Sequence, residues 1–280
     1  MKKTVLYIAL AIIATSCVER IEVELDPTYV RLVVDGSITT DTSKYTVNLT
    51  QTADYFYNAP IPRVTNATVT LYDGDSSYIL KETEPGQSGI YESESNIIGT
   101  VGKTYTLNIR LEGEIGGNTN YSSSCELMSV TRLDSTSVVF HDDWGDDGFY
   151  EVKIFAQEPG NEVNYYMFNL YRNGRLMSDT ISKVIVSDDR YINGSYINGL
   201  GAFYLNNSNA WEKLYPGDTI ILQMSGITKE YYNFVSEVQS AGFNIPFFVG
   251  PPANVVGNVN NGGVGFFTAY SNSYATTIVK

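Results

Sequence analysis

The sequence predicts a mostly β protein, in which an Ig-like or transthyretin-like β-sandwich precedes a second β-rich domain that carries one amphipathic helix. Three observations predict this class. Apolar and polar residues alternate with period two along many short segments. Turn-forming pairs such as Asp35-Gly36 and Asn173-Gly174 separate these segments. A single segment, 228–241, carries apolar residues at helical spacing instead.

The first predicted domain covers residues 29–127. Its clearest strand is 104–111, where Tyr105, Leu107, Ile109 and Leu111 alternate with polar residues. Shorter alternating runs are centred on Leu32, Val47 and Val69. Each run is typical of a strand with one buried and one wet face, and short strands joined by such turns favour a sandwich.

The second predicted domain covers residues 130–280. Alternation returns at 150–154, 166–170 and 220–224, and Asn173-Gly174 predicts a two-residue hairpin turn. Thr228 is a good helix N-cap and Gly242 a good residue to follow the helix. The Gly- and Asn-rich tail, 247–278, is expected to end in a strand, with Phe266, Phe267 and Tyr270 in the core or on the sheet surface.

Composition limits the possible functions. The chain has 280 residues, 18 basic and 31 acidic side chains, and a net charge of −13, which argues against electrostatic binding of nucleic acid. His141 is the only histidine, so mechanisms that need two imidazoles are excluded. His141 is expected in a surface loop, and no nucleophile elbow, zinc-protease motif or P-loop is present. We therefore predict a protein that is not an enzyme, with no cofactor.

Residues 1–16 have the form of an export signal: two lysines, a short apolar run and small residues. The apolar run is shorter than the roughly 20 residues that span a bilayer. The string Ala14-Thr15-Ser16-Cys17 resembles a bacterial lipobox, which implies that Cys17 becomes an acylated N-terminus. The alternative is an ordinary secretory signal that is followed by a chance cysteine.

Residues 17–28 are then a tether of roughly 35 Å at about 3.3 Å per residue. Removal of residues 1–16 leaves 16 basic and 31 acidic residues, a net charge of −15, which anionic lipid surfaces repel. Val18 is not the Asp that retains enteric lipoproteins at the inner membrane, so the outer membrane is favoured. The periplasmic or cell-surface face stays open. With Cys17 acylated, Cys125 has no disulfide partner, and a small buried hydrophobe is favoured over a reactive thiol.

Two segments are candidate sites. Asp142, Asp143, Asp146 and Asp147 offer hard oxygen ligands for calcium, although the spacing does not match an EF-hand, and a solvated turn is the alternative. Trp144 among them is either a stacking platform for a sugar or a lid on the sandwich. Tyr191, Tyr196, Tyr204 and Trp211 lie in Asn- and Gly-rich loops suited to contact with a ligand, or else cover the sheet.

Two stretches carry a family resemblance: Asn164-Tyr165-Tyr166-Met167-Phe168 after Glu158-Pro159-Gly160, and 251–271 with its Pro-Pro-Ala-Asn and Gly-Phe-Phe-Thr-Ala-Tyr-Ser runs. With the lipobox, they resemble the Bacteroidota lipoprotein family called domain of unknown function 4249. The resemblance implies a partner, an outer-membrane TonB-dependent receptor, but no catalytic residues. A non-catalytic accessory subunit of nutrient uptake is the favoured function. The alternatives are a structural or adhesive envelope protein and, less favoured, a hydrolase.

Overall fold

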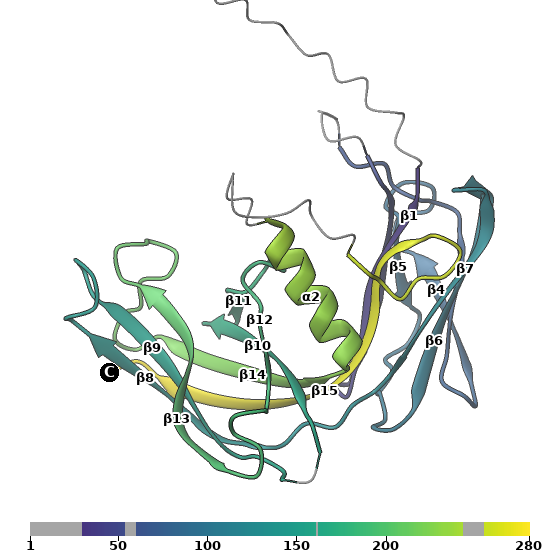
Figure 1. The fold of residues 1–280 in the computed structure, drawn as a ribbon. Helices are drawn as coiled ribbons and strands as arrows, with labels where there is room; N and C mark the ends of the chain where they lie inside the picture. The colour runs from purple at the N-terminus through teal and green to yellow at the C-terminus, as the bar shows by residue number, and fades with distance from the viewer. Residues whose placement is uncertain (1–29, 54–59, 161, 243–254) are drawn as a thin grey trace, which may run out of the picture.

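The computed structural model describes residues 30–53, 60–160, 162–242 and 255–280. Within these ranges the chain forms strands β1 to β15 and one helix, α2, which confirms the mostly β class (Figure 1). None of the helical structure in the described ranges is both long and apolar enough to cross a membrane. The predicted signal peptide 1–16, Cys17 and the tether 17–28 lie outside the described residues.

The first part of the chain forms a sheet that wraps around its own core. In the sheet the strands neighbour one another in the order β1-β2-β5-β4-β3-β6-β7. The strands are β1 (Leu32–Thr39), β2 (Thr46–Gln51), β3 (Thr68–Tyr72), β4 (Ser77–Glu82), β5 (Ile90–Ser93), β6 (Thr104–Ile115) and β7 (Asn118–Glu126). The alternating residues predicted to face inward in β6, from Tyr105 to Leu111, are all buried.

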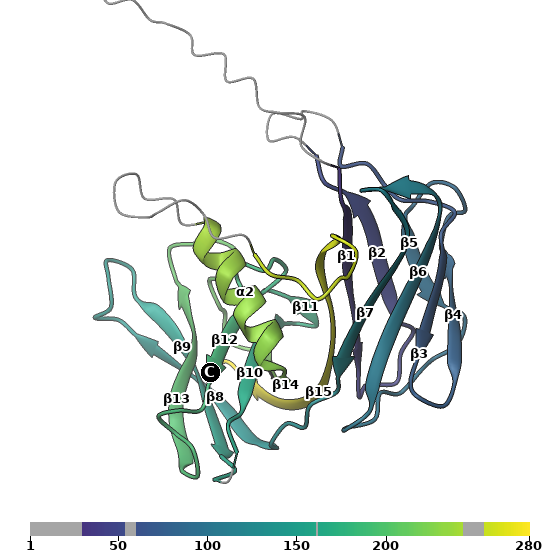
Figure 2. The same ribbon diagram turned by 45° about the vertical axis from the view of Figure 1, so that its right-hand side comes forward.

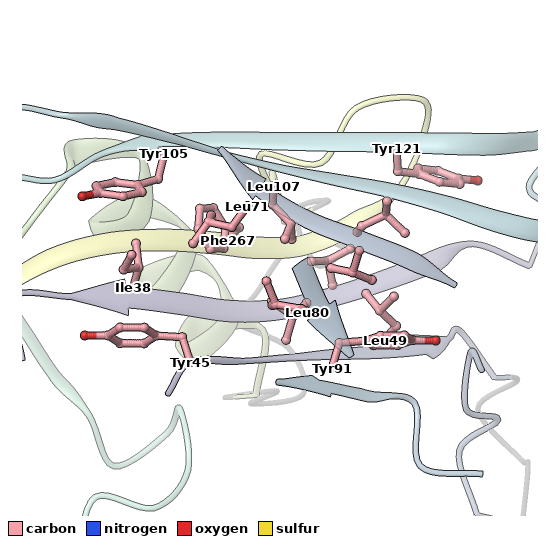
Figure 3. Close-up of a cluster of buried hydrophobic side chains, with 14 of the residues drawn as sticks. Ile38, Tyr45, Leu49, Leu71, Leu80, Tyr91, Tyr105, Leu107, Tyr121 and Phe267 are labelled. Atoms are coloured by element: carbon pink, nitrogen blue, oxygen red, sulfur yellow. The ribbon is translucent and has the colours of Figure 1, made fainter. Parts of the chain in front are cut away.

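This first core contains tyrosines whose rings are buried and whose hydroxyl groups lie at its two ends (Figure 3). At one end Tyr45 donates to the Thr39 carbonyl over 2.8 Å. At the other end Tyr91 donates to the Val64 carbonyl over 2.9 Å. Buried hydroxyl groups that keep a hydrogen-bond partner avoid the desolvation penalty, so aromatic residues can fill the core without an unpaired polar atom.

The second part of the chain forms two facing sheets. A three-stranded sheet has the order β13-β9-β8, from β8 (Leu133–His141), β9 (Phe149–Gln157) and β13 (Tyr196–Asn206). Opposite it lie β10 (Tyr165–Arg172), β11 (Arg175–Leu176), β12 (Ile185–Asp188), β14 (Thr219–Ile227) and β15 (Val264–Ile278). A second hydrophobic core fills the space between them. Asn173 and Gly174 both have positive φ, 50° and 79°, which confirms the predicted two-residue hairpin turn.

Helix α2 (Lys229–Gly242) lies on the other face of this sheet, over β10, β12 and β15 (Figure 1). Thr228 caps its start, because the Thr228 Oγ1 accepts a hydrogen bond from the Tyr231 amide over 3.2 Å. Gly242 is the last residue of the helix rather than the residue after it. Val235 is fully buried, and the ring of Phe234 lies 5.2 Å from that of Phe266. The predicted helix and its N-cap are confirmed.

The last strand, β15, joins the two parts (Figure 2). Its first half, 264–270, pairs in parallel with β1, and its second half, 271–278, pairs antiparallel with β14. Phe267 and Ala269 therefore belong to the first core, whereas Ala275 belongs to the second. One long sheet runs through the regions 29–127 and 130–280 that the sequence predicts as separate domains.

The Asn-rich segment before β15 fastens the edge of β7. Val259 forms a β-bridge with Ser123, and the Asn260 amide donates to the Ser122 carbonyl over 3.0 Å. The Asn258 side chain accepts from the Phe267 amide over 3.0 Å and donates to the Phe267 carbonyl over 2.7 Å. These bonds give this part of the tail a structural role. Asn261, in the turn before β15, has a positive φ of 53°.

Candidate functional site

A cavity of about 490 Å³ opens at one end of the second β unit. We name it the Trp211 pocket, because the Trp211 side chain in its wall is 63% exposed. It lies between the β10–β11 hairpin, the end of β13 and the loop after β13. It is lined by Leu170, Arg172, Arg175, Leu176, Met177, Ser178, Asp179, Lys183, Phe203, Tyr204, Leu205, Asn209, Trp211 and Glu212.

The loop that presents Trp211 is shaped by its Asn residues. Asn209 Oδ1 accepts a hydrogen bond from the Trp211 amide over 3.1 Å, and Asn206 Oδ1 accepts from the Ser208 amide over 2.9 Å. Such bonds from a short amide side chain to the main chain two residues later form compact turns. Asn207 Nδ2 also donates to the Asp147 carbonyl over 2.8 Å, which fixes the loop to the β8–β9 turn. The exposed indole is therefore held by defined contacts.

Most of the charged side chains in the Trp211 pocket have a hydrogen-bond partner within the protein. Lys183 lies 2.7 Å from Asp179, and this bond holds the pKa of Asp179 below its usual value. Glu212 accepts from the Asn206 amide over 2.7 Å, and Arg172 donates to the Lys213 carbonyl over 2.6 Å. Arg175 instead contacts an aromatic ring.

The Arg175 guanidinium lies 4.4 Å above the centre of the Trp211 ring, a cation–π contact. Within the described ranges Arg175 forms no ion pair. The pocket therefore offers an aromatic face beside the Arg175 guanidinium, whose charge also helps to lower the pKa of Asp179.

A second aromatic group, the Trp144 stack, adjoins the pocket. The Trp144 and His141 rings are parallel within 5° with their centres 3.8 Å apart, and Trp144 lies 5.9 Å from Tyr204, which lines the Trp211 pocket. His141 is the last residue of β8, so the expectation of a surface-loop histidine is wrong. Its position in the sheet places its Nε2 atom 2.8 Å from Glu151 Oε2 on β9.

Glu151 is held in its charged form. Burial alone would raise the pKa of Glu151, but hydrogen bonds from His141 and Lys153 outweigh it, and the pKa is below its usual value. The Lys153 Nζ atom lies 3.2 Å from the same carboxylate oxygen. No serine is hydrogen-bonded to His141 in the parts of the chain that the structure describes.

The acidic loop, residues 142–147, contains Trp144. Asp142, Asp143, Asp146 and Asp147 lie in the turn between β8 and β9 and are all exposed. Across the described ranges, no group of three or more His, Cys, Asp or Glu residues is placed to hold a metal ion. Calcium binding at this loop stays a prediction.

The tyrosines singled out in the sequence divide between the two ends of β13. Tyr196 and Tyr204 lie in the strand, exposed on the sheet surface, so the prediction that they lie in loops is wrong. Tyr204 lies at the end beside Trp211 and Trp144, whereas Tyr196 starts the strand, and Tyr191, 90% exposed, precedes it. Eight residues of strand at about 3.3 Å each separate Tyr196 from Tyr204 by roughly 26 Å. The structure thus brings together three of the five aromatic candidates. Arg175 and Glu151 could not be predicted as members of these groups, because nothing local in the sequence links Arg175 to Trp211 or Glu151 to His141.

The remaining cysteine is inaccessible. Cys125 is buried, as predicted for a small hydrophobe, and its burial raises the pKa of its thiol. A raised pKa lowers the fraction of reactive thiolate. Cys125 therefore adds no chemistry to the candidate site.

The fold and site define a two-core β protein with an aromatic, cation-bearing pocket on its second core. The family model for a domain of unknown function (DUF4249) matches residues 18–276, and the chain belongs to this family. No curated protein matches the chain. One solved structure, described as a cytokine receptor complex, is similar at 9% identity and a TM-score of 0.25, over 71% of this chain and 86% of that one. Similarity this low carries no functional argument.

Proposed function

We propose that the chain is an outer-membrane lipoprotein and a non-catalytic binding subunit of a TonB-dependent nutrient uptake system. The observation that carries this proposal is the Trp211 pocket, where Tyr204, Trp211 and Arg175 meet. Its volume lies in the range of roughly 300–1,000 Å³ that is usual for small-molecule sites. An apolar aromatic wall with a few polar groups is the composition that such sites share.

The charge pattern of the pocket indicates the kind of ligand. The pocket is lined by the cations Arg172, Arg175 and Lys183 and by the acids Asp179 and Glu212, and Arg175 covers one face of the Trp211 ring. A ligand with a flat apolar part and an anionic group would complete both contacts, because a guanidinium pairs well with carboxylate and an indole packs against apolar surfaces. We therefore propose a small anionic nutrient rather than a cationic one.

The lipid anchor would allow a weak contact between the protein and its receptor to be occupied. Acylation of Cys17 would confine the protein to the membrane plane of its receptor, and such tethering raises the effective concentration of one partner near the other. The net charge of −15 on residues 17–280 keeps the body away from anionic lipid. We propose that residues 130–280 face the receptor.

A structural or adhesive role has its own supporting observation. Tyr191 and Tyr196 are exposed far from the Trp211 pocket, and exposed tyrosines are common in contacts with macromolecules. A hydrolase would need a nucleophile beside the His141–Glu151 pair, and the ring of His141 is already stacked on Trp144.

The test is a gentle pull-down of the acylated protein from detergent-solubilised membranes of the native host. We expect an outer-membrane β-barrel receptor to co-purify, together with a small molecule that is released on denaturation. Trp211→Ala should lose the small molecule but keep the receptor, and Tyr72→Ala, an exposed aromatic on β3, is the matched control. Recovery of the wild-type protein alone would contradict the proposal.

A further inference from the structure

Two carboxylates are buried at the end of the second core that lies away from the Trp211 pocket. Glu158, 1% exposed, follows β9, and Asp189, fully buried, follows β12. Carboxylates are almost never this buried unless a cation or several hydrogen bonds compensate for the lost hydration. The environment of this pair therefore needs an explanation.

The strand register places both carboxylates beside the same tyrosine. Asp189 extends the β10–β12 ladder opposite Asn164. The main-chain amide of Asp189 donates to the Asn164 carbonyl over 3.2 Å, and the main-chain amide of Asn164 donates to Asp189 Oδ2 over 2.9 Å. Residues opposite one another in a ladder point to the same face, as do residues two apart in one strand. Asp189 therefore shares the core-facing side of β10 with Tyr166, whose hydroxyl lies 2.7 Å and 2.9 Å from the two oxygens of Glu158.

Among the residues that the structure describes, no positive charge is paired with either carboxylate. The ion pairs formed by the described residues include neither Glu158 nor Asp189. Asp189 Oδ1 is buried without any hydrogen-bond partner, while Oδ2 accepts from Asn164 and, over 3.1 Å, from Asn193 Nδ2. Burial raises the pKa of Glu158, and the nearby charges of Asp189 and Glu162 raise it further.

We propose that Glu158 and Asp189 bind a calcium ion between the turn at 158–160 and the turn at 189–195. The two turns already touch, since a Cβ on Gly160 would lie 3.1 Å from Gly194. Calcium accepts carboxylate, main-chain carbonyl and water oxygens in flexible geometry, so two side-chain ligands suffice when main-chain oxygens and water complete the shell. The ion would neutralise the pair and tie the end of β9 to the segment between β12 and β13.

This site is separate from the acidic turn 142–147. That turn lies at the opposite end of β9, next to the Trp144 stack, and its carboxylates are exposed to water. Exposed carboxylates gain little from an ion, whereas a buried uncompensated pair gains a great deal. The structure therefore favours calcium binding at Glu158 and Asp189 over calcium binding at the acidic turn 142–147.

The experiment is a titration of the full chain with Tb³⁺, a luminescent calcium analogue, followed by competition with Ca²⁺. Tyr166 touches Glu158, so excitation of aromatic side chains should sensitise a bound Tb³⁺. We expect saturable luminescence that Ca²⁺ displaces, and a higher melting temperature in Ca²⁺ than in chelator, by mass action. Asp189→Asn and Glu158→Gln should each weaken binding at least tenfold.

The control is the double variant Asp142→Asn with Asp146→Asn, which should bind Tb³⁺ as the wild type does. Loss of binding in this control, with binding retained in Asp189→Asn, would overturn the proposal. So would a wild-type melting temperature that is the same in millimolar Ca²⁺ and in chelator, because the pair would then be compensated by protonation of Glu158. The wild-type comparison keeps the test decisive even if a variant does not fold.

Discussion

The Asn258 side chain makes the main-chain hydrogen bonds to β15 that a neighbouring strand would otherwise make, and its removal should destabilise the whole chain. At Phe267 one side of β15 pairs with β1, and on the other side the main-chain N–H and C=O bond the Asn258 side chain, through Oδ1 at 3.0 Å and Nδ2 at 2.7 Å. Phe267 is 1% exposed, so Asn258→Ala would leave a main-chain N–H and C=O without partners in a buried place. Each such group costs about 1–3 kcal/mol, so we expect the two together to lower the free energy of unfolding by about 2–6 kcal/mol.

The assay is urea unfolding, followed by far-ultraviolet circular dichroism and by tryptophan fluorescence. Both tryptophans, Trp144 and Trp211, belong to the second β unit, whereas Phe267 lies in the first core. Because β15 runs through both units, the unfolding midpoints measured by the two signals should shift to the same lower urea concentration. Asn120→Ala, an exposed Asn on β7, should change stability by less than about 0.5 kcal/mol. An Asn258→Ala variant as stable as this control would refute the reasoning.

Three further predictions concern other parts of the chain. The Glu82 carboxylate accepts three main-chain amides, from Asn66, Gly86 and Gly89, which outweigh its burial and hold its pKa below the ordinary 4.5. The stability that ionised Glu82 contributes is therefore present above pH 4.5 and is lost as the pH falls through the lower pKa of the folded state. Glu82→Gln should be less stable than the wild type at pH 7, and the two should become equally stable in acid. A difference in stability that is the same at pH 7 and pH 3 would count against this. Gly226→Ala would place a Cβ 1.9 Å from the Ser129 carbonyl oxygen and should cost about 3 kcal/mol or prevent folding, whereas Gly113→Ala, with open space, should be nearly neutral in thermal unfolding. Cys17→Ala should abolish metabolic labelling with a fatty acid, and labelling that persists would exclude the proposed anchor.

Local pattern predicted the elements of the fold well. The alternation around Leu107 and the Asn173-Gly174 turn depend on neighbours in sequence, and both are present in the structure. Thr228 caps its helix for the same reason. The pairing of β15 with β1 joins residues that are more than 220 positions apart, such as Ile38 and Ala269, and no local pattern encodes such a partner.

The candidate sites show the same limit. Trp211 and Tyr204 were predicted from the Tyr-, Asn- and Gly-rich composition of their segment, although Tyr204 lies in a strand. Arg175 lies on the β10–β11 hairpin and meets Trp211 only in the folded chain. The high density of acidic residues predicted a calcium site at the turn 142–147. The buried residues Glu158 and Asp189 are 31 positions apart in sequence, so no local pattern links them. Burial, not density, decides which carboxylates need a cation, and burial is a property of the fold.

The central claim is that the protein binds an outer-membrane receptor through its second β unit, and site-specific photocrosslinking in intact native cells tests it most directly. One crosslinker replaces Tyr191, which is 90% exposed in the second unit, and a matched one replaces Ile79, which is 55% exposed on β4 of the first. The proposal predicts a covalent adduct with a TonB-dependent β-barrel from position 191 and none from position 79. Adducts from position 79 alone, or no barrel adduct from either position, would contradict it.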